Sequence, residues 1–303
     1  MASSVVTSKL DTRDRQHDTP TARTSMKQLF KALMMHSAIG AWLGKLPFLK
    51  GLYLRHVWAG RMDLFYGLFG SYAEAERFSA NIGKVGWHDD TLAELLVRDA
   101  EVEAPTLFQT SQFAVMLWLS KLLQPGSTVV DFGGAGGIFY ELCERYGLLK
   151  PPLSWHVVDM PDMVERGRQR HARLGSTMIS FGSELAEAPA PDIMLMLGMI
   201  QYLPDPFGEQ GPGILDTVPA LPEHILINKI PISDAPDAWT AQNHVSSVIP
   251  CRLFNRAKFL AYFEARGYRL QDRWLVPELQ AEIPFHPERT LTYFEGFYLR
   301  RQA

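Results

Sequence analysis

Cysteine is scarce in this sequence, and its net charge is small. Only two of the 303 residues are cysteines, Cys143 and Cys251, and neither belongs to a CxxC pair or stands beside a histidine cluster. This argues against a disulfide framework and a structural zinc site, so we expect no metal and a reducing, cytoplasmic setting. Lys and Arg number 30 against 33 Asp and Glu, giving a formal charge of −3. That balance argues against nucleic acid as a partner.

Long hydrophobic runs are also missing. The best candidate, from Ala32 to Gly44 between two lysines, has 13 residues, fewer than the roughly 20 that a helix needs to cross a bilayer. The N-terminal residues are polar and mixed in charge, without the order of a secretion signal. We therefore expect no integral membrane segment, and a disordered tail over residues 1–25.

Acidic residues are absent from Thr19 to Met62, where seven lysines and arginines stand. The apolar residues of Met26 to Arg61 are typical of helices. Two interpretations remain open: a basic element that touches an anionic membrane or an acidic partner, or a helical arm that packs on the main domain. We favour the second and expect an N-terminal helical arm and cap over residues 26–104, whose helices offer a surface for a homodimer.

The rest of the chain alternates short apolar runs with helical patterns. The runs VVDF at 129, HVVD at 156, DIMLML at 192 and HILINKI at 224 are separated by helical stretches near 139–146, 163–174 and 257–266. A further helix is expected over 106–123, with its apolar face on Leu107, Ala114, Leu117, Trp118 and Leu122. Such alternation predicts a doubly wound α/β domain over residues 105–303, with a mostly parallel, Rossmann-like sheet.

A glycine-rich turn follows the first of these runs. The dinucleotide pattern G-x-G-x-x-G fails, because Phe139 stands where the third glycine should fall. The pattern that fits is acid-x-G-x-small-x-G, which is typical of S-adenosylmethionine binding and comprises Asp131, Gly133, Ala135 and Gly137, with Gly134 inside the turn. A turn of this kind lets backbone approach a ligand closely, and the helix after it presents free N–H groups.

A second acid, Asp159, ends the next apolar run. A carboxylate can accept hydrogen bonds from both hydroxyls of an adenosine ribose, so this position suits a nucleoside-binding site. The alternative for Asp159 alone is a cap for the helix that follows.

Three segments now suggest a family. Asp131-Phe-Gly-Gly-Ala-Gly-Gly, Asp159-Met-Pro-Asp-Met-Val and Gly198-Met-Ile-Gln-Tyr-Leu-Pro-Asp205 resemble, in order and spacing, the motifs of class I S-adenosylmethionine-dependent O-methyltransferases that act on small molecules. From Asp63 to Arg300 the chain is also similar to a bacterial family of methyltransferases of uncharacterised substrate, around Phe69 to Ala75, the DFGG turn, Gln201 to Pro206, and the stretch from Gln242 onward. The resemblance implies a seven-stranded sheet with an antiparallel last hairpin near 268–274 and 292–299.

The resemblance also implies roles for single residues. Gly133 and Gly137 would face the methionine part of the cofactor, Asp159 would bind the ribose with Met160 against the adenine, and Asp131 would hold the turn. Gly198 opens the third motif. After Gly182 the family commonly has an acid that meets the adenine amine; here Ser183 stands in that place, and the choice between Ser183 and Glu184 stays open.

Catalysis is where this sequence departs from the family. The position of the usual catalytic histidine holds Gln201, which cannot take a proton at neutral pH. We expect Gln201 to position the acceptor, with Tyr202 beside it and with His244, in an expected long loop over the strand ends, as candidates for the base. Lys229 either neutralises an acidic substrate or lies at the surface.

Three functions remain open from the sequence. The first is transfer of a methyl group from S-adenosylmethionine to a small-molecule acceptor, at oxygen rather than nitrogen or carbon, in bacterial secondary-metabolite or glycan biosynthesis, with S-adenosylhomocysteine as product. The second is an inactive scaffold or regulatory partner with the same fold. The third is a nicotinamide-dependent reductase.

Overall fold

The computed structural model describes residues 46–54, 58, 64–82, 84–85, 110–244 and 247–302. The expected N-terminal tail, most of the basic segment 26–61 and the stretch 86–104 of the expected arm and cap lie outside these residues. Within the basic segment the structure describes α3 (Pro47–Tyr53), as the sequence predicts. No helix in the described ranges combines the length and the apolar character that crossing a membrane requires.

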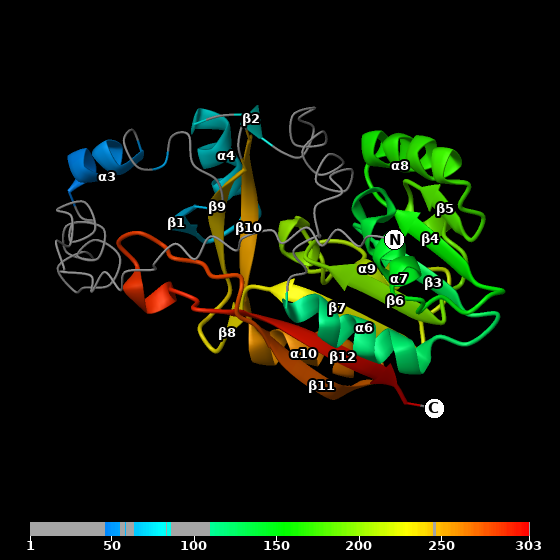
Figure 1. Cartoon of the computed structure of the whole chain (residues 1–303). Coiled ribbons are helices and arrows are strands. Elements are labelled where there is room, and N and C mark those ends of the chain that lie inside the picture. The colour runs from blue at the N-terminus through cyan, green and yellow to red at the C-terminus, as the bar shows by residue number, and fades with distance from the viewer. Residues whose placement is uncertain are drawn as a thin grey trace, which may run out of the picture.

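A seven-stranded sheet forms the main body of the protein (Figure 1). Its strand order is β11-β12-β7-β6-β3-β4-β5, with β3 (Thr128–Phe132), β4 (Ser154–Val158), β5 (Ile179–Gly182), β6 (Ile193–Leu197), β7 (His224–Ile230), β11 (Tyr268–Val276) and β12 (Phe294–Arg301). Strands β3 to β7 are parallel, whereas β12 runs antiparallel to both β7 and β11. The expected sheet with an antiparallel last hairpin is confirmed.

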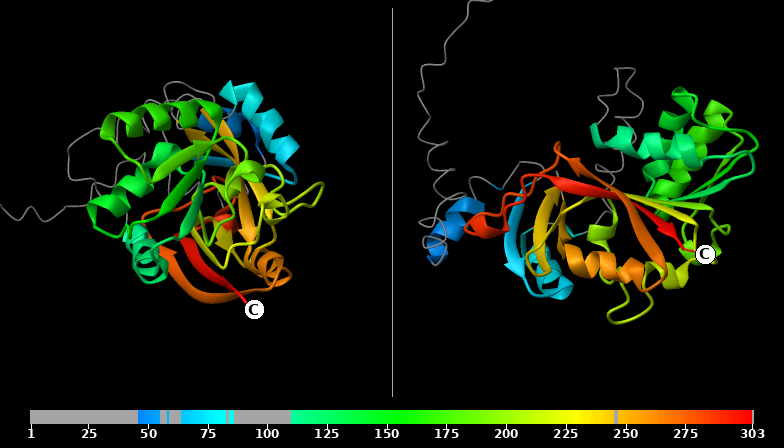
Figure 2. Two further views of the ribbon diagram at one scale, coloured as in Figure 1. Left: turned by 90° about the vertical axis from the view of Figure 1, so that its right-hand side faces the viewer. Right: turned by 90° about the horizontal axis from the view of Figure 1, so that it is seen from below.

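Helices cover both faces of this sheet (Figure 2). They are α6 (Thr110–Leu122), α7 (Ile138–Arg145), α8 (Pro161–Leu174), α9 (Ile214–Thr217) and α10 (Arg256–Glu264). Two separate apolar cores follow from the alternation of side chains along a strand. Val130 belongs to the core that includes Phe259 of α10, and its neighbour Val129 belongs to the core that includes Leu119 of α6 and Tyr140 of α7. The doubly wound prediction is confirmed.

The apolar face expected for α6 is right only in part: Trp118 and Leu122 pack against the core, Leu117 does not, and Leu107 lies outside the described residues. Leu117 is 53% exposed, and the buried side is made by Ser111, Val115, Met116 and Leu119. The helix is apolar over most of its circumference, so periodicity alone could not choose the buried side. The polar Ser111 can be buried because its hydroxyl donates to Glu278 Oε1 at 2.5 Å.

A second, smaller sheet stands beside the first (Figure 1). It comprises β1 (Phe65–Phe69), β9 (Ala238–His244), β10 (Ser247–Asn255), β2 (Lys84–Val85) and β8 (Ile232–Ser233). Helix α4 (Tyr72–Ile82) packs on it through Phe78, whose ring lies 5.3 Å from that of Tyr66. The described N-terminal residues therefore add strands as well as helices.

The long loop expected to carry His244 is instead strand β9, so that prediction is wrong. Its polar residues are buried because the surrounding chain satisfies them. Thr240 Oγ1 donates to the Tyr66 carbonyl at 3.2 Å, and Asn243 Nδ2 donates to the Trp58 carbonyl at 3.0 Å. A strand stabilised by such bonds lacks the apolar pattern that identifies strands in sequences.

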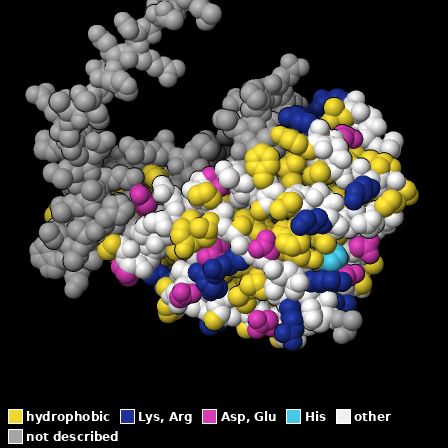
Figure 3. All heavy atoms as spheres, turned by 60° about the horizontal axis from the view of Figure 1, so that its bottom comes forward, with side chains coloured by type: hydrophobic (Ala, Val, Ile, Leu, Met, Phe, Trp, Pro, Cys, Tyr) yellow, Lys and Arg dark blue, Asp and Glu magenta, His cyan; other side chains and the backbone are white. Residues whose placement is uncertain are grey.

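Large apolar side chains are also exposed on the main domain. Phe113 and Leu117 of α6 are 49% and 53% exposed, and Leu275 of the contacting strand β11 is 52% exposed. On the face shown in Figure 3, hydrophobic side chains lie among lysines, arginines and acids.

The expected homodimer through the N-terminal helices concerns residues mostly outside the described ranges and stays a prediction.

Candidate functional site

A cavity of about 600 Å³ lies at the carboxyl ends of the parallel strands. The chain leaves β3 toward β4 and β5 on one side and returns to β6 on the other, so the cavity sits where the strand order reverses. Its walls are mostly apolar. They are made by Gln112, Asp131, Phe132, Gly133, Gly134, Ala135, Ile138, Phe139, Val158, Asp159, Met160, Pro161, Asp162, Met163, Ser183, Leu197, Gly198, Met199, Tyr202, Leu203, Asn228 and Lys229.

The glycine-rich turn packs closely against neighbouring residues of the protein. A Cβ on Gly133 would lie 2.7 Å from the Met199 side chain, and one on Gly134 would lie 2.7 Å from the Asp131 carboxyl group. Gly137, at φ +89°, has no room either, because its Cβ would lie 2.6 Å from His171 Nε2. These glycines are therefore required by packing inside the protein, in addition to any ligand that approaches the turn.

Asp131 is a buried carboxylate in the cavity wall. Its residue is 1% exposed, and in the described part of the chain neither oxygen accepts a hydrogen bond of normal geometry. Burial raises the pKa of Asp131 to about 7, the nearby Trp155 indole opposes the rise without reaching hydrogen-bond geometry, and the charge of Asp159 adds to it. Both oxygens are enclosed by protein atoms, so a cationic ligand in the cavity would act on this carboxylate through its charge rather than by a direct hydrogen bond.

Asp159 fixes the turn. Its Oδ2 accepts from the Ala135 N–H at 2.8 Å and its Oδ1 from the Met160 N–H at 2.8 Å. The hydrogen bond that holds the turn thus comes from Asp159, whereas the sequence assigned this role to Asp131. Burial raises the pKa of Asp159, and the two backbone N–H groups oppose that rise. Each oxygen keeps a second lone pair with which it can accept from a ligand.

The structure brings most of the residues predicted for the site into one cavity wall. Those that line it are Asp131, Gly133, Gly134, Ala135, Asp159, Met160, Ser183, Gly198 and Tyr202; those outside the lining are Gly137, Gly182, Gln201 and His244. Of the two candidates after β5, Ser183 lines the cavity and Glu184 does not.

Gln201 is turned away from the cavity. It is 3% exposed, and its Nε2 donates to the Gly198 carbonyl at 3.1 Å and to the Lys229 carbonyl at 3.4 Å. Gly198 follows β6, and Lys229 lies near the end of β7. The Gln201 side chain therefore links the ends of β6 and β7, and it supports the cavity wall without lining it.

Tyr202 connects the cavity to the second sheet. Its hydroxyl donates to Gln242 Oε1 of β9 at 3.0 Å, and its ring lies 6.2 Å from the ring of His244. Among the described residues His244 does not line the wall itself, and this ring contact joins it to a residue that does.

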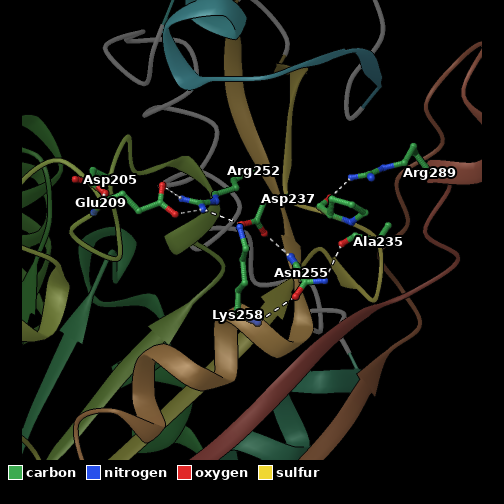
Figure 4. A network of polar contacts seen from close by, with 9 residues as sticks. Asp205, Glu209, Ala235, Asp237, Arg252, Asn255, Lys258 and Arg289 are labelled. Carbon is green, nitrogen blue, oxygen red and sulfur yellow. Dashed lines mark hydrogen bonds and ion pairs between the residues drawn. The ribbon is translucent and has the colours of Figure 1, made fainter.

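A buried arginine holds the segment that follows Tyr202 (Figure 4). Arg252 of β10 is 3% exposed, and its Nη2 lies 2.9 Å from Glu209 Oε1 and 3.1 Å from Asp237 Oδ2. Its guanidinium also stacks on Phe207, 5.5 Å from the ring centre. Asp205, the last residue of the third motif, accepts the N–H groups of residues 209, 210 and 211, so its carboxylate shapes this loop and does not enter the cavity lining.

Sequence reasoning missed several cavity residues, of which Asn228 is the clearest. It is 1% exposed; its Nδ2 donates to Ser111 Oγ at 3.1 Å and its Oδ1 accepts from Trp274 Nε1 at 2.9 Å. The signal was present, because Asn228 and Lys229 are consecutive polar residues inside the apolar run HILINKI. No group of three or more His, Cys, Asp and Glu side chains placed to hold a metal ion occurs among the described residues.

Comparison with known proteins gives structural neighbours only. No protein-family model matches the chain, and no curated protein is similar to it in sequence. A methyltransferase from Aquifex aeolicus described as SAM dependent is 13% identical, with a TM-score of 0.44 over 67% of this chain and 97% of that one. The 1,6-didemethyltoxoflavin-N1-methyltransferase of Burkholderia thailandensis, with bound S-adenosylhomocysteine, is 17% identical, with a TM-score of 0.41 over 72% and 92%. The magnesium protoporphyrin IX methyltransferase of Synechocystis PCC 6803 is 13% identical, with a TM-score of 0.43 over 76% and 95%. Overlaps this loose assign no activity to this chain.

Proposed function

We propose that this protein is an S-adenosylmethionine-dependent methyltransferase that acts on a small-molecule acceptor. The observation that carries the proposal is the Asp131 carboxylate, which is buried in the cavity wall with no hydrogen-bond donor on either oxygen in the described structure. S-adenosylmethionine carries a sulfonium and an ammonium group, and either can supply the positive charge that this carboxylate lacks.

The residues beside Asp131 fit the remainder of the cofactor. Asp159 lies at the end of the adjacent strand β4 and has lone pairs left for the two ribose hydroxyls. Met160, Met163 and Phe139 provide apolar wall for the adenine, and Ser183 provides a hydroxyl at the end of β5. A nicotinamide dinucleotide fits less well, because its pyrophosphate would bring negative charge into a cavity that three aspartates, 131, 159 and 162, already line.

When bound, the cofactor supplies an electrophilic methyl group, and the protein's work is alignment. Methyl transfer is an in-line displacement, so the apolar walls hold the acceptor at reaction distance and keep water out. The motif resemblance favours oxygen as the methylated atom, and a bacterial biosynthetic enzyme of the cytoplasm as the setting.

Isothermal titration calorimetry tests the proposal. We expect heat from S-adenosylmethionine and S-adenosylhomocysteine and none from NADH. Asp159→Ala should weaken both adenosyl ligands, whereas Asp192→Ala should not, although Asp192 also accepts a backbone N–H, from Thr128 at 2.8 Å. Asp192 precedes β6 and therefore lies at the opposite end of the sheet. Binding of NADH without binding of S-adenosylhomocysteine would refute the proposal, and it would favour the reductase.

A further inference from the structure

Lys229 lies in the same cavity, at a distance from the two carboxylates described above. Along the strand ends the order is β4, β3, β6, β7, so Asp159 and Lys229 are separated by three strand spacings, about 14 Å. The acids on β3 and β4 make one half of the cavity, and the ends of β6 and β7 make the other. If the cofactor occupies the first half, as proposed, the second half is left for the acceptor.

The backbone directs Lys229 into this second half. Its φ is +61°, in the left-handed region that few residues other than glycine adopt and that costs roughly 1 kcal/mol. Its aliphatic stem crosses Gly198, where an added Cβ would lie 3.3 Å from the Lys229 Cδ. Strain of this kind persists only where the surrounding structure imposes it, and it concentrates at functional sites.

The ammonium group has no fixed counterion. The Nζ of Lys229 makes no hydrogen bond or ion pair with any residue in the described ranges, although the residue lines the cavity. The acidic group that interacts electrostatically with this ammonium group is Glu278. Its Oε1 already accepts hydrogen bonds from the backbone N–H of Ser111 at 3.0 Å and from the Ser111 hydroxyl at 2.5 Å. Burial lowers the pKa of Lys229, and the charge of Glu278 opposes that change. A buried ammonium group without a hydrogen-bonded partner is costly, so Lys229 is suited to bind an anion that enters the cavity.

Among the described residues, the cavity offers no histidine as a base for the acceptor. No histidine lines it in the described structure, and Gln201 faces backbone carbonyls. An acceptor that arrives as an oxyanion needs no base, because its oxygen attacks the methyl carbon directly while the carbon–sulfur bond breaks and the sulfur keeps the electron pair. The products are a neutral methyl ether or ester and a neutral thioether, so no proton has to be moved.

We infer that Lys229 determines specificity by binding an acceptor that presents an anionic oxygen, a carboxylate, phenolate or enolate, over the ends of β6 and β7. The inference rests on the proposed function, since it places the cofactor over β3 and β4. A carboxylate at Lys229 has two possible sources, the acceptor and the methionine part of the cofactor, and the experiment separates them.

The test uses the full chain saturated with S-adenosylhomocysteine and three matched pairs of probes: benzoate and benzamide, phenylacetate and phenylacetamide, and salicylate and salicylamide. Binding is followed by ligand-observed NMR titration. We expect acids to bind on the order of tenfold more tightly than amides, as a charge-assisted hydrogen bond provides. Lys229→Met should remove the preference for acids, and Lys229→Arg should retain it. If Lys229 acted as a base, arginine could not replace it, because arginine stays protonated. Lys258→Met, on the exposed side of α10, is the control for loss of one positive charge.

Each outcome has one meaning. Equal binding of acids and amides by the unmodified protein overturns the inference and leaves the proposed function intact. A loss of S-adenosylhomocysteine affinity in Lys229→Met also overturns the inference and leaves the proposed function intact, because the anion at Lys229 would then belong to the cofactor. Failure of the unmodified protein to bind S-adenosylhomocysteine at all overturns the proposed function, and the inference with it.

Discussion

The charge of Asp131 can be removed in two independent ways, by acid and by the substitution Asp131→Asn. Both should weaken S-adenosylmethionine binding. The side chain is fully enclosed, and burial raises its pKa to about 7 from 3.8. A shift of about 3 pKa units corresponds to roughly 4 kcal/mol, the free energy by which the empty cavity disfavours the ionised form. A cationic ligand must recover part of this free energy when it binds.

The sign of the effect on stability follows from the raised pKa. The contribution of Asp131 to stability is fully present below its unfolded pKa of 3.8 and is lost as the pH rises through about 7. At pH 8 the empty protein therefore contains a buried carboxylate, and Asp131→Asn removes its charge at nearly constant shape. The substitution should raise the free energy of unfolding at pH 8, by up to about 4 kcal/mol, while it lowers the affinity for the cofactor.

Calorimetric titration of S-adenosylmethionine between pH 5.5 and 7.0 measures the ligand side of this linkage. The ionised fraction of Asp131 in the empty protein rises from about 3% to about half across that range, while the α-amino group of the ligand stays mostly protonated. The affinity should accordingly rise on the order of tenfold, with release of a proton on binding at the acid end. In Asp131→Asn it should be low and flat. An affinity of the unmodified protein that does not change over this range would refute the assignment of Asp131 to the cation.

Three further substitutions address separate parts of the site. Asp159→Ala should weaken cofactor binding by about 1–3 kcal/mol in calorimetry, because two hydroxyl donors and one turn N–H lose their acceptor. Gly137→Ala should lower the melting temperature by several degrees more than Gly147→Ala. Both glycines have positive φ, but only at Gly137 would the added Cβ meet a neighbouring atom, His171 Nε2, at 2.6 Å. Equal losses in the two variants would show that backbone strain accounts for the whole effect. Arg252→Met should lower the free energy of unfolding by about 3 kcal/mol in urea titrations, because the largely buried Asp237 loses its guanidinium partner while Glu209 is half exposed. A neutral result would mean that these ion pairs add no net stability.

The main sheet could be predicted because its strands are buried on both faces. Such strands are continuous apolar runs, and VVDF, DIMLML and HILINKI became β3, β6 and β7 with boundaries within a residue or two. Strand β5 was not singled out, because Ile179–Gly182 is only four residues long and ends in glycine. Short strands of this kind are defined by their neighbours more than by their own sequence.

The second sheet could not be predicted for the opposite reason. Strand β9 reads AWTAQNH, and its burial depends on partners that are distant in sequence, such as Trp58 for Asn243. No local pattern indicates that an amide will be buried when its acceptor lies 185 residues away. The expectation of a loop followed directly from treating polar residues as solvated.

The binding half of the site was easier to predict than the catalytic half. Asp131 and Asp159 are marked by strand ends and a glycine-rich turn, features that the backbone itself requires, and both line the cavity. The direction of the Gln201 side chain is decided by two carbonyl groups on neighbouring strands, which no sequence spacing encodes. Lys229 was predicted either to meet an acidic substrate or to lie at the surface, and the structure places it in the cavity wall.

Part of the cavity wall is shaped from outside the main sheet. Tyr202 lines the cavity and donates to Gln242 of β9, and the loop after it is held by Arg252 of β10. A change in the hairpin formed by β9 and β10 would consequently move the wall at Tyr202 and Leu203, whereas Asp131 and Asp159 are held within the main sheet, where β3 pairs with β4 and β6 and the Asp159 N–H donates to the Gly182 carbonyl of β5 at 3.1 Å. The wall at Tyr202 thus depends on the second sheet, whereas Asp131, Asp159 and Lys229 all stand at strand ends of the main sheet.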